Sequence, residues 1–311
     1  MPLPESLVAA AIRHARGDAP ALVPVHRSEC TAHSNDRVQI RFSDGRTLVV
    51  KRARHRWAAP RFSVSRRACE IIARRTGIVA PRPLPLPAPP DGMPAEAYWR
   101  IDRPTLADVW PQLRAGERVW ALRHWGRLAA RLHGIRFPAH GSLLQGGTQP
   151  LSGYLREDLG QRLLPAVRAH WPQGVALVER LLERTDGVAA RADAGGVLVH
   201  NDLHMQNVLC ERRKHSARSV GVLDLEAAIA GPPEAELAQM EVLHGPLFGK
   251  ELPQGWMDEV MRGYGRATDP VLRAFFRAVH LLNMGFHAAF VGWHDHAADV
   301  LRLAQAQDEH A

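Results

Sequence analysis

Residues 197–210 read VLVHNDLHMQNVLC, a polar loop between two short apolar runs. The apolar runs are rich in valine and leucine and are bounded by polar residues, which favours two short buried strands. The loop between them carries the carboxylate of Asp202 and the amide of Asn207. These two side chains are therefore predicted to be held between strands of the protein interior.

A third apolar run, residues 220–223, leads directly to Asp224. A carboxylate at the end of a buried strand loses hydration, and a cation or several hydrogen-bond donors usually offset that cost. Asp224 therefore indicates a polar site rather than an ordinary surface position.

Lysine is rare in this chain and occurs at Lys51, Lys214 and Lys250, whereas arginine supplies most other cations. A compact ammonium group differs from a planar guanidinium, so a retained lysine indicates lysine-specific chemistry. Residues 38–51 alternate around the turn at residues 43–45, which predicts a hairpin whose second strand carries Lys51 on an apolar side. Lys214 and Lys250 fit ordinary exposed cations.

Phosphoryl transfer from ATP requires a carboxylate near the attacking hydroxyl, oxygen ligands for Mg²⁺ and a cation on the phosphates. Asp202 fits the base and Lys51 fits the cation on the phosphates. Asn207 and Asp224 fit the metal, because Mg²⁺ is a hard ion that takes oxygen ligands. His200, the second candidate of the catalytic loop, fits a structural role in which it braces the loop. These residues predict an enzyme that uses ATP and Mg²⁺.

The same residues resemble the catalytic segment of the aminoglycoside phosphotransferase and choline kinase family, which shares its fold with protein kinases. The pattern His200-x-Asp202-x-x-x-x-Asn207 is similar to the family's catalytic loop, and Asp224-Leu225-Glu226 is similar to its magnesium-binding segment. Residues 231–238, GPPEAELA, resemble the segment that follows, with Glu236 where an Asp is usual. We expect Glu226 and Glu236 to brace loops rather than to bind the metal.

The resemblance also implies a nucleotide site in the N-terminal third of the chain. The cofactor-binding residues that it implies are Lys51, Ser34, Asn35, Glu70, Ile101 and Arg103. Ser34 and Asn35 correspond to the phosphate loop, although residues 29–33 contain no glycine. Glu70 is the expected helix partner of Lys51, about one turn later than the family spacing, and residues 98–103 correspond to the hinge that holds adenine.

We expect an α+β, two-lobed, protein-kinase-like fold. Residues 1–103 are expected to form a small antiparallel-sheet lobe that ends in the hinge, and residues 104–311 a larger, mainly helical lobe with the catalytic loop and the acceptor site. Helices are predicted near residues 4–16, 63–76, 122–132, 150–169, 174–190, 233–244, 254–267 and 269–291, and a strand over 97–101.

Composition excludes several classes of function. The net charge of +8 comes from arginines spread along the chain without interleaved aromatic residues, which argues against a nucleic-acid partner. No apolar run of about eighteen residues predicts a membrane span. The three scattered cysteines fit neither a disulfide framework nor a zinc site, so we expect a cytoplasmic protein. We further expect a monomer or a homodimer.

Two classes of function remain open from the sequence. The first is a kinase that phosphorylates a hydroxyl of a small molecule, such as an antibiotic or related metabolite, with a role in antibiotic resistance as one possibility. The second is a non-catalytic kinase-like module, or a protein kinase, that uses the same cleft. The short distance from Asp224 to Glu236 leaves no room for a long activation segment and favours a small acceptor. The charge of the acceptor and the choice between ATP and GTP stay open.

Three histidines, His280, His287 and His294, recur every seven residues near the C-terminus. This spacing is too long for a local metal pair, so we expect a solvated or partly packed helix face. Phe290 and Trp293 are expected to be part of the core.

Overall fold

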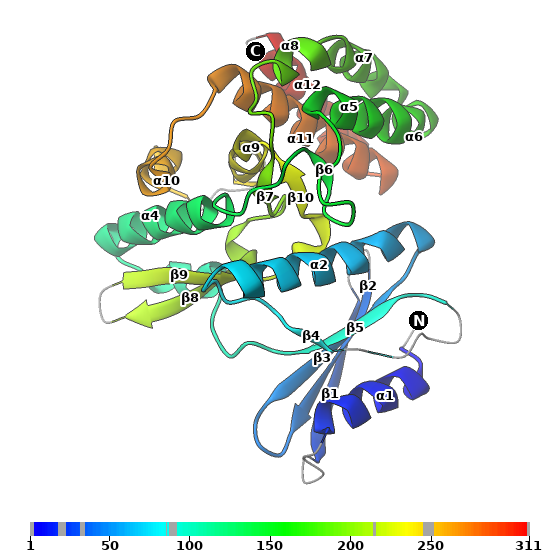
Figure 1. Ribbon diagram of the computed structural model, residues 1–311, viewed down its shortest axis with the longest axis vertical. Coiled ribbons are helices and arrows are strands. Elements are labelled where there is room, and N and C mark those ends of the chain that lie inside the picture. Colours follow the sequence, from blue (N-terminus) through cyan, green and yellow to red (C-terminus); the bar gives the residue numbers. More distant parts are fainter. Residues whose placement is uncertain are drawn as a thin grey trace.

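The computed structural model describes residues 3–17, 23–31, 35–84, 86, 92–213, 216–244 and 252–309. Its N-terminal part is built on an antiparallel sheet, and its C-terminal part is mainly helical (Figure 1). The predicted α+β class is therefore confirmed. Ser34, Lys214 and Lys250 lie outside the described residues.

The strands and helices follow one another along the chain without an internal repeat. The strands are β1 (Pro24–Thr31), β2 (Asn35–Phe42), β3 (Thr47–Ala53), β4 (Pro83–Leu84), β5 (Ala95–Trp99), β6 (Gly141–Ser142), β7 (Val197–Val199), β8 (Val208–Arg213), β9 (Ser216–Val222) and β10 (Ile229–Gly231). The α-helices are α1 (Glu5–Arg16), α2 (Ala59–Arg75), α3 (Leu106–Val109), α4 (Ala115–Leu132), α5 (Leu151–Leu155), α6 (Leu164–His170), α7 (Val175–Glu183), α8 (Thr185–Ala189), α9 (Pro233–Leu243), α10 (Trp256–Tyr264), α11 (Pro270–Phe290) and α12 (His294–Glu309). A π-helical stretch, η3 (Arg156–Leu163), joins α5 to α6, and short 3₁₀ turns include η5 (Met205–Asn207) and η6 (Leu225–Ala227).

The main sheet has the strand order β1-β2-β3-β5-β4, with antiparallel neighbours throughout. The predicted hairpin is confirmed as β2 and β3, and Gly45 in its turn adopts a positive φ of 85°, which glycine tolerates without steric cost. Strand β5 begins at Ala95, two residues earlier than the sequence predicts. In this register Lys51 of β3 lies directly opposite Glu96 of β5.

The alternation of side chains gives the sheet two different faces. One face carries Ile40, Val50 and Ala97 and packs against α1, where these residues form a small apolar core. Lys51 follows Val50 in β3, and Glu96 precedes Ala97 in β5. Both side chains therefore point to the opposite face of the sheet. The cation and the carboxylate therefore share the side of the sheet that is turned away from α1.

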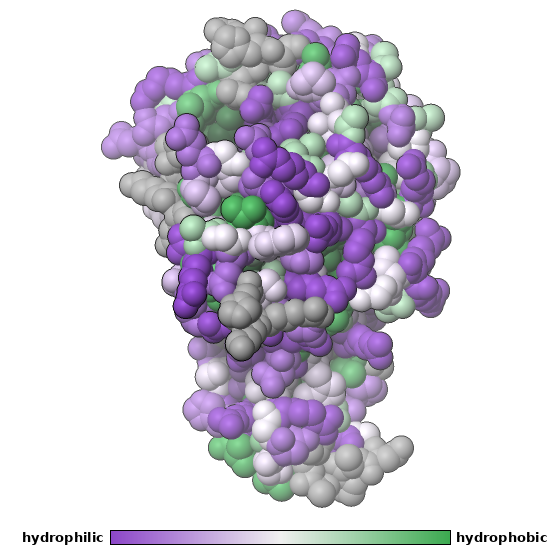
Figure 2. Space-filling view, turned by 90° about the vertical axis from the view of Figure 1, so that its left-hand side faces the viewer, coloured by the Kyte–Doolittle hydropathy of each residue, from purple (hydrophilic) through white to green (hydrophobic). Residues whose placement is uncertain are grey.

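Helix α2 lies between the sheet and the helical part (Figure 1). It begins at Ala59, four residues earlier than predicted, because Pro60 is well accepted in a first helical turn. Its buried residues Ala68 and Ile72 belong to the same apolar core as Leu128 of α4 and Leu225 of η6. The helix thus fastens the segment after Asp224 to the N-terminal part. Figure 2 shows one side of the molecule, covered mostly by hydrophilic residues.

The C-terminal region differs from the sequence-based expectation. His294 begins a separate helix, α12, so the three histidines do not share one helix face. The expectation that Phe290 and Trp293 are core residues is wrong, because their exposed fractions are 54% and 65% at the break between α11 and α12.

Candidate active site

The catalytic loop predicted from the sequence joins β7 to β8, and its two ends are fixed by these buried strands. Among the described residues, two non-glycine residues have a positive φ, Asn201 at 59° and Asp224 at 55°. Such a conformation is costly for most side chains and tends to occur at functional sites. Both strained positions belong to the segments that the sequence predicts to carry the chemistry.

Within the loop, the side chain of Asn207 is hydrogen-bonded to Asp202. Its Nδ2 donates to the backbone carbonyl of Asp202 at 2.9 Å and to the Asp202 carboxylate at 3.1 Å, and it also lies 3.1 Å from His204 Nε2. The backbone carbonyl of Asn207 accepts a hydrogen bond from Leu223 at 2.8 Å, which ties the loop to the residue before Asp224. Every hydrogen bond of the Asn207 side chain to a described residue uses Nδ2, so its carbonyl oxygen is left for a ligand.

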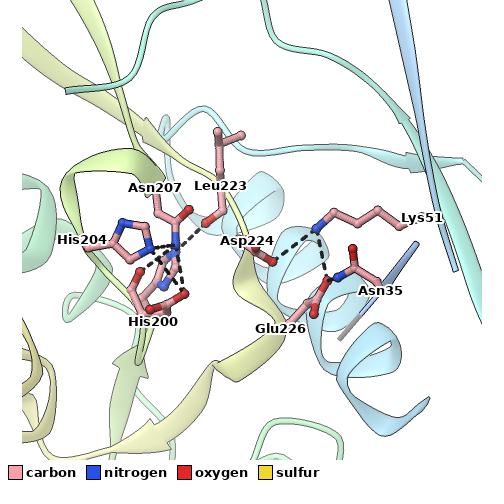
Figure 3. A network of polar contacts seen from close by, with 9 residues as sticks. Asn35, Lys51, His200, His204, Asn207, Leu223, Asp224 and Glu226 are labelled. Carbon is pink, nitrogen blue, oxygen red and sulfur yellow. Dashed lines mark hydrogen bonds and ion pairs between the residues drawn. The ribbon is translucent and has the colours of Figure 1, made fainter. Parts of the chain in front are cut away.

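Lys51 meets the helical part through two carboxylates. Its Nζ lies 3.3 Å from Asp224 Oδ1 and 3.1 Å from Glu226 Oε1. The Asn35 amide lies 3.5 Å from the same Glu226 oxygen, and Figure 3 shows these side chains turned toward one another. Lys51 is only 6% exposed, so its charge depends on these partners.

The electrostatics of this cluster keep Lys51 charged. Burial by itself lowers the pKa of the ammonium group, but Tyr98, Asp224 and Glu226 surround it and the pKa is raised overall. Burial likewise raises the pKa of Asp224, but the attraction of Lys51 outweighs it and the pKa is lowered. The buried ammonium group and the partly exposed carboxylate therefore form an ion pair that couples the sheet to the loop after β9.

Asp202 has the properties expected of a general base. Burial raises its pKa to about 7, repulsion from Asp224 adds to the rise, and the hydrogen bond from Asn207 acts in the opposite direction. A base with a pKa near neutral combines a useful deprotonated fraction with a useful affinity for the proton.

His200 is fully buried between the catalytic loop and the segment before Asp224. Its Nε2 lies 2.7 Å from the backbone carbonyl of Leu223, to which it donates. Burial lowers its pKa to about 4, so the imidazole is neutral. The histidine therefore links the catalytic loop to Leu223, which lies between the end of β9 and Asp224.

Glu236 of α9 accepts hydrogen bonds from the backbone of the same loop. It is completely buried, and its Oε2 accepts a hydrogen bond from the His200 amide at 2.5 Å. The amides of Asn201 and Leu203 also interact with this carboxylate, although burial raises its pKa to about 8. The expected loop-bracing role of Glu236 is thus visible in the geometry.

The structure does not bring Glu70 to Lys51. Glu70 is half exposed and faces Arg67 at 3.8 Å on the outer side of α2. The reason is helical geometry, since each residue turns the helix by about 100° and the preceding residue, Cys69, already faces the interior. The expectation that Glu70 pairs with Lys51 is therefore corrected.

The segment after β5 is placed between the two parts of the chain. The Arg103 guanidinium forms an ion pair with Glu211 of β8 at 2.8 Å, and its backbone amide donates to the carbonyl of Ile101 at 2.9 Å. The carbonyl of Pro104 accepts from the Cys210 amide. These contacts fasten the expected hinge to the β8–β9 hairpin.

Glu96 belongs to the same cluster, although no pattern in the sequence points to it. This carboxylate is 3% exposed and lies across the strand pair from Lys51. Burial raises its pKa to about 7, while Lys51 lowers it. The cross-strand register is the signal that would have revealed it, and that register depends on tertiary pairing.

The residues fit Mg²⁺ by their donor chemistry. The described residues contain no group of three or more His, Cys, Asp or Glu side chains that could hold a metal ion. Mg²⁺ does not need such a cage, because it is commonly held by one or two protein oxygens together with phosphate and water. One carboxylate, Asp224, and one amide oxygen, Asn207, meet that requirement.

A cavity of about 230 Å³ opens beside Glu226. Its polar lining includes Gln149, Tyr154 and Glu157, and α2 contributes Val64. Gln149 Nε2 donates to Glu157 Oε2 at 2.5 Å. The cavity thus joins the Lys51 cluster to η3.

The comparison with protein families decides the class. A model of the phosphotransferase enzyme family matches residues 31–276, which is well over half of the chain. The chain belongs to the phosphotransferase enzyme family. The catalytic-loop motif and the Asp224 motif predict membership of this family, and the match confirms that prediction. The chain is a small-molecule phosphotransferase of protein-kinase-like fold.

Solved structures share the fold of this phosphotransferase at low sequence identity. A thermostable mutant of aminoglycoside phosphotransferase APH(4)-Ia, in ternary complex with AMP-PNP and hygromycin B, has a TM-score of 0.67 and 17% identity, covering 92% of this chain and 94% of the other. Macrolide 2'-phosphotransferase MphH from Brachybacterium faecium has a TM-score of 0.59 and 17% identity, with 94% and 96% covered. The GDP complex of wild-type aminoglycoside 2'-phosphotransferase-IIIa has a TM-score of 0.62 and 13% identity, with 96% and 97% covered.

No curated protein matches this sequence. Within the described part of the phosphotransferase, no helix has the length and apolar character that a membrane span needs.

Proposed function

We propose that this phosphotransferase transfers the γ-phosphoryl group of ATP to a hydroxyl of a small molecule in a Mg²⁺-dependent reaction. The observation that carries the proposal is the convergence of Lys51 with Asp224, next to the pair formed by Asp202 and Asn207. One cation, one base and two oxygen ligands are the groups that this chemistry needs.

The proposed mechanism assigns one task to each side chain. The Asp202 carboxylate would orient the acceptor hydroxyl and take its proton as the oxygen attacks the γ-phosphorus. Lys51 would bind the phosphates that are not transferred. Asn207 and Asp224 would hold Mg²⁺, which neutralises charge on the phosphate oxygens. His200 would act indirectly, by keeping the loop that carries Asp202 in place.

The nucleotide is proposed to lie between the sheet and the helical part. Ser34 and Asn35 would approach the phosphates, and the buried Asn35 amide next to Glu226 supports this placement. Ile101 and Arg103 would border adenine in a hinge that divides the chain after residue 103. Fold neighbours were solved with AMP-PNP or GDP, so ATP and GTP are both to be tested.

The acceptor is proposed to be a hydroxylated antibiotic or related metabolite that enters through the cavity beside Glu226. Glu226 lines this cavity and lies within electrostatic range of Asp202, which supports a path for the acceptor from the cavity toward the base. Tyr154, Gln149 and Glu157 offer hydrogen-bonding groups there. Neighbouring structures contain hygromycin B or kanamycin, both hydroxylated compounds. A cytoplasmic role in antibiotic resistance is part of this proposal.

Incubation with γ-labelled ATP or GTP, Mg²⁺ and a panel of antibiotics, amino alcohols and sugars tests the proposal. Mass analysis should show one product that is heavier by one phosphoryl group, and the label should move to it. Nucleotide binding without transfer to any compound, across a broad panel, would favour a non-catalytic nucleotide-binding module instead.

A further inference from the structure

Glu96 is a buried carboxylate that the proposed mechanism does not use. It lies directly opposite Lys51 in the β3–β5 pair, so both side chains extend from the same face of the sheet. It is 3% exposed, and its Oε2 has no hydrogen-bond partner among the described residues. A buried carboxylate without partners is costly, so its position next to a buried lysine calls for a physical explanation.

Helix α2 offers no carboxylate to Lys51. In protein kinases the lysine that contacts the phosphates is held by a glutamate of the neighbouring helix. Here the inward side of α2 carries Ser65 and Cys69, and both are buried. Burial raises the pKa of Cys69, Glu96 adds to the rise and Lys51 opposes it, so both charges lie within electrostatic range of the thiol. Glu70, the single acidic residue of the helix, faces Arg67 instead.

The present partners of Lys51 cannot both hold it in the working state. Asp224 is a proposed metal ligand, and Glu226 is two residues away on the same turn. When Asp224 turns toward Mg²⁺, Lys51 must turn toward the phosphates and loses at least that contact. Glu226 stays outside the metal set, but it belongs to the segment that carries Asp224 and moves with it. A carboxylate on the sheet would keep the ammonium group in place independently of that segment.

We propose that Glu96 is the positioning residue of Lys51, and that this strand carboxylate replaces the helix glutamate used by protein kinases. In the nucleotide complex Glu96 holds the lysine from the sheet side while the phosphates bind its other side. The inference rests on the proposed function, because it concerns how the same site holds its nucleotide. Glu96 itself touches neither the nucleotide nor the acceptor.

Binding measurements on a matched pair of variants test the proposal. The parent protein, Glu96→Gln and Glu70→Gln are titrated calorimetrically with Mg²⁺·AMP-PNP and, separately, with adenosine, which has no phosphates. Glu96→Gln should weaken Mg²⁺·AMP-PNP by about tenfold, a typical effect for a lost contact to a charged group, and leave adenosine unchanged. Glu70→Gln should bind both ligands like the parent protein.

The outcomes separate the possible failures. If Glu96→Gln binds Mg²⁺·AMP-PNP as tightly as the parent, or loses adenosine to the same degree, Glu96 has no positioning role and the proposal is overturned. If the parent itself binds no Mg²⁺·AMP-PNP, the proposed function fails and this inference fails with it. A structure of the parent complex needs no variant: Lys51 Nζ should lie about 3 Å from Glu96, and a lysine still bound to Glu226 and away from Glu96 would contradict the proposal.

Discussion

Lys51 Nζ lies 3.3 Å from Asp224 Oδ1, although 173 positions separate the two residues in the sequence. The first stands in the middle of the sheet, and the second follows the last strand of a hairpin in the helical part. Together with the Lys51–Glu226 pair, this ion pair joins the sheet to the helical part of the chain. A nucleotide with Mg²⁺ would have to replace it, and the account predicts where each partner then goes.

Replacing Asp202 by asparagine should abolish most of the turnover. The amide keeps the size of the side chain but cannot take a proton, and general bases typically contribute about 10²- to 10⁴-fold to a rate. The turnover number with the acceptor found in the panel is the quantity to measure. Calorimetric binding of Mg²⁺·AMP-PNP should remain within about twofold of the parent, since a proton acceptor contributes little to nucleotide affinity. Full turnover in this variant would remove Asp202 from its assigned role.

Asn201 should tolerate glycine but not valine. Its φ of 59° is open to glycine and acceptable to asparagine, whereas other L-residues lose about 1–2 kcal/mol there, and a β-branched one is expected to lose more. Urea unfolding should show a loss of at least about 2 kcal/mol for Asn201→Val and little change for Asn201→Gly. Because the residue adjoins Asp202, the valine variant should also lose activity. Equal stability of the two variants would mean that the backbone there is not strained.

The free energy of unfolding should depend on pH through Glu236. Burial raises the pKa of this carboxyl from 4.5 to about 8, so the folded protein keeps a proton there that the unfolded chain releases. Its contribution to stability is fully present below pH 4.5 and is lost as the pH rises through about 8. The slope from one such group is at most about 1.4 kcal/mol per pH unit.

As the pH rises from 5.5 to 7.5, the free energy of unfolding in urea should therefore fall less for Glu236→Gln than for the parent. Glu70→Gln, at an exposed carboxylate, serves as the control and should keep the slope of the parent. Parallel slopes for all three proteins would show that Glu236 is ionised in the folded state.

The parts of the fold that local pattern dictates could be predicted from the sequence. The β2–β3 hairpin has alternating apolar residues around an Asp44-Gly45 turn, and both features act within a few residues. The long helices have apolar residues at spacings of three and four. The catalytic loop could be predicted because its polar residues are fixed between two apolar strands.

The errors arose where tertiary contacts decide. Strand β5 was expected two residues too late, and that shift alone left Glu96 outside the strand and outside the candidate site. Glu70 was chosen because it is the acidic residue of α2, but the helix turns Cys69 inward and Glu70 outward. Phe290 and Trp293 are hydrophobic, yet the chain breaks between two helices there and leaves both exposed. None of these outcomes can be read from neighbours in the sequence.

Metal-dependent nucleotide binding tests the central claim most directly. Calorimetric titration with AMP-PNP should give tight binding to the parent protein in the presence of Mg²⁺ and at least about tenfold weaker binding with EDTA. Asp224→Asn should bind AMP-PNP with nearly the same affinity under both conditions, because its metal ligand is gone. Parent protein that binds equally well with and without Mg²⁺, or an Asp224→Asn variant that keeps the full metal dependence, would contradict the account.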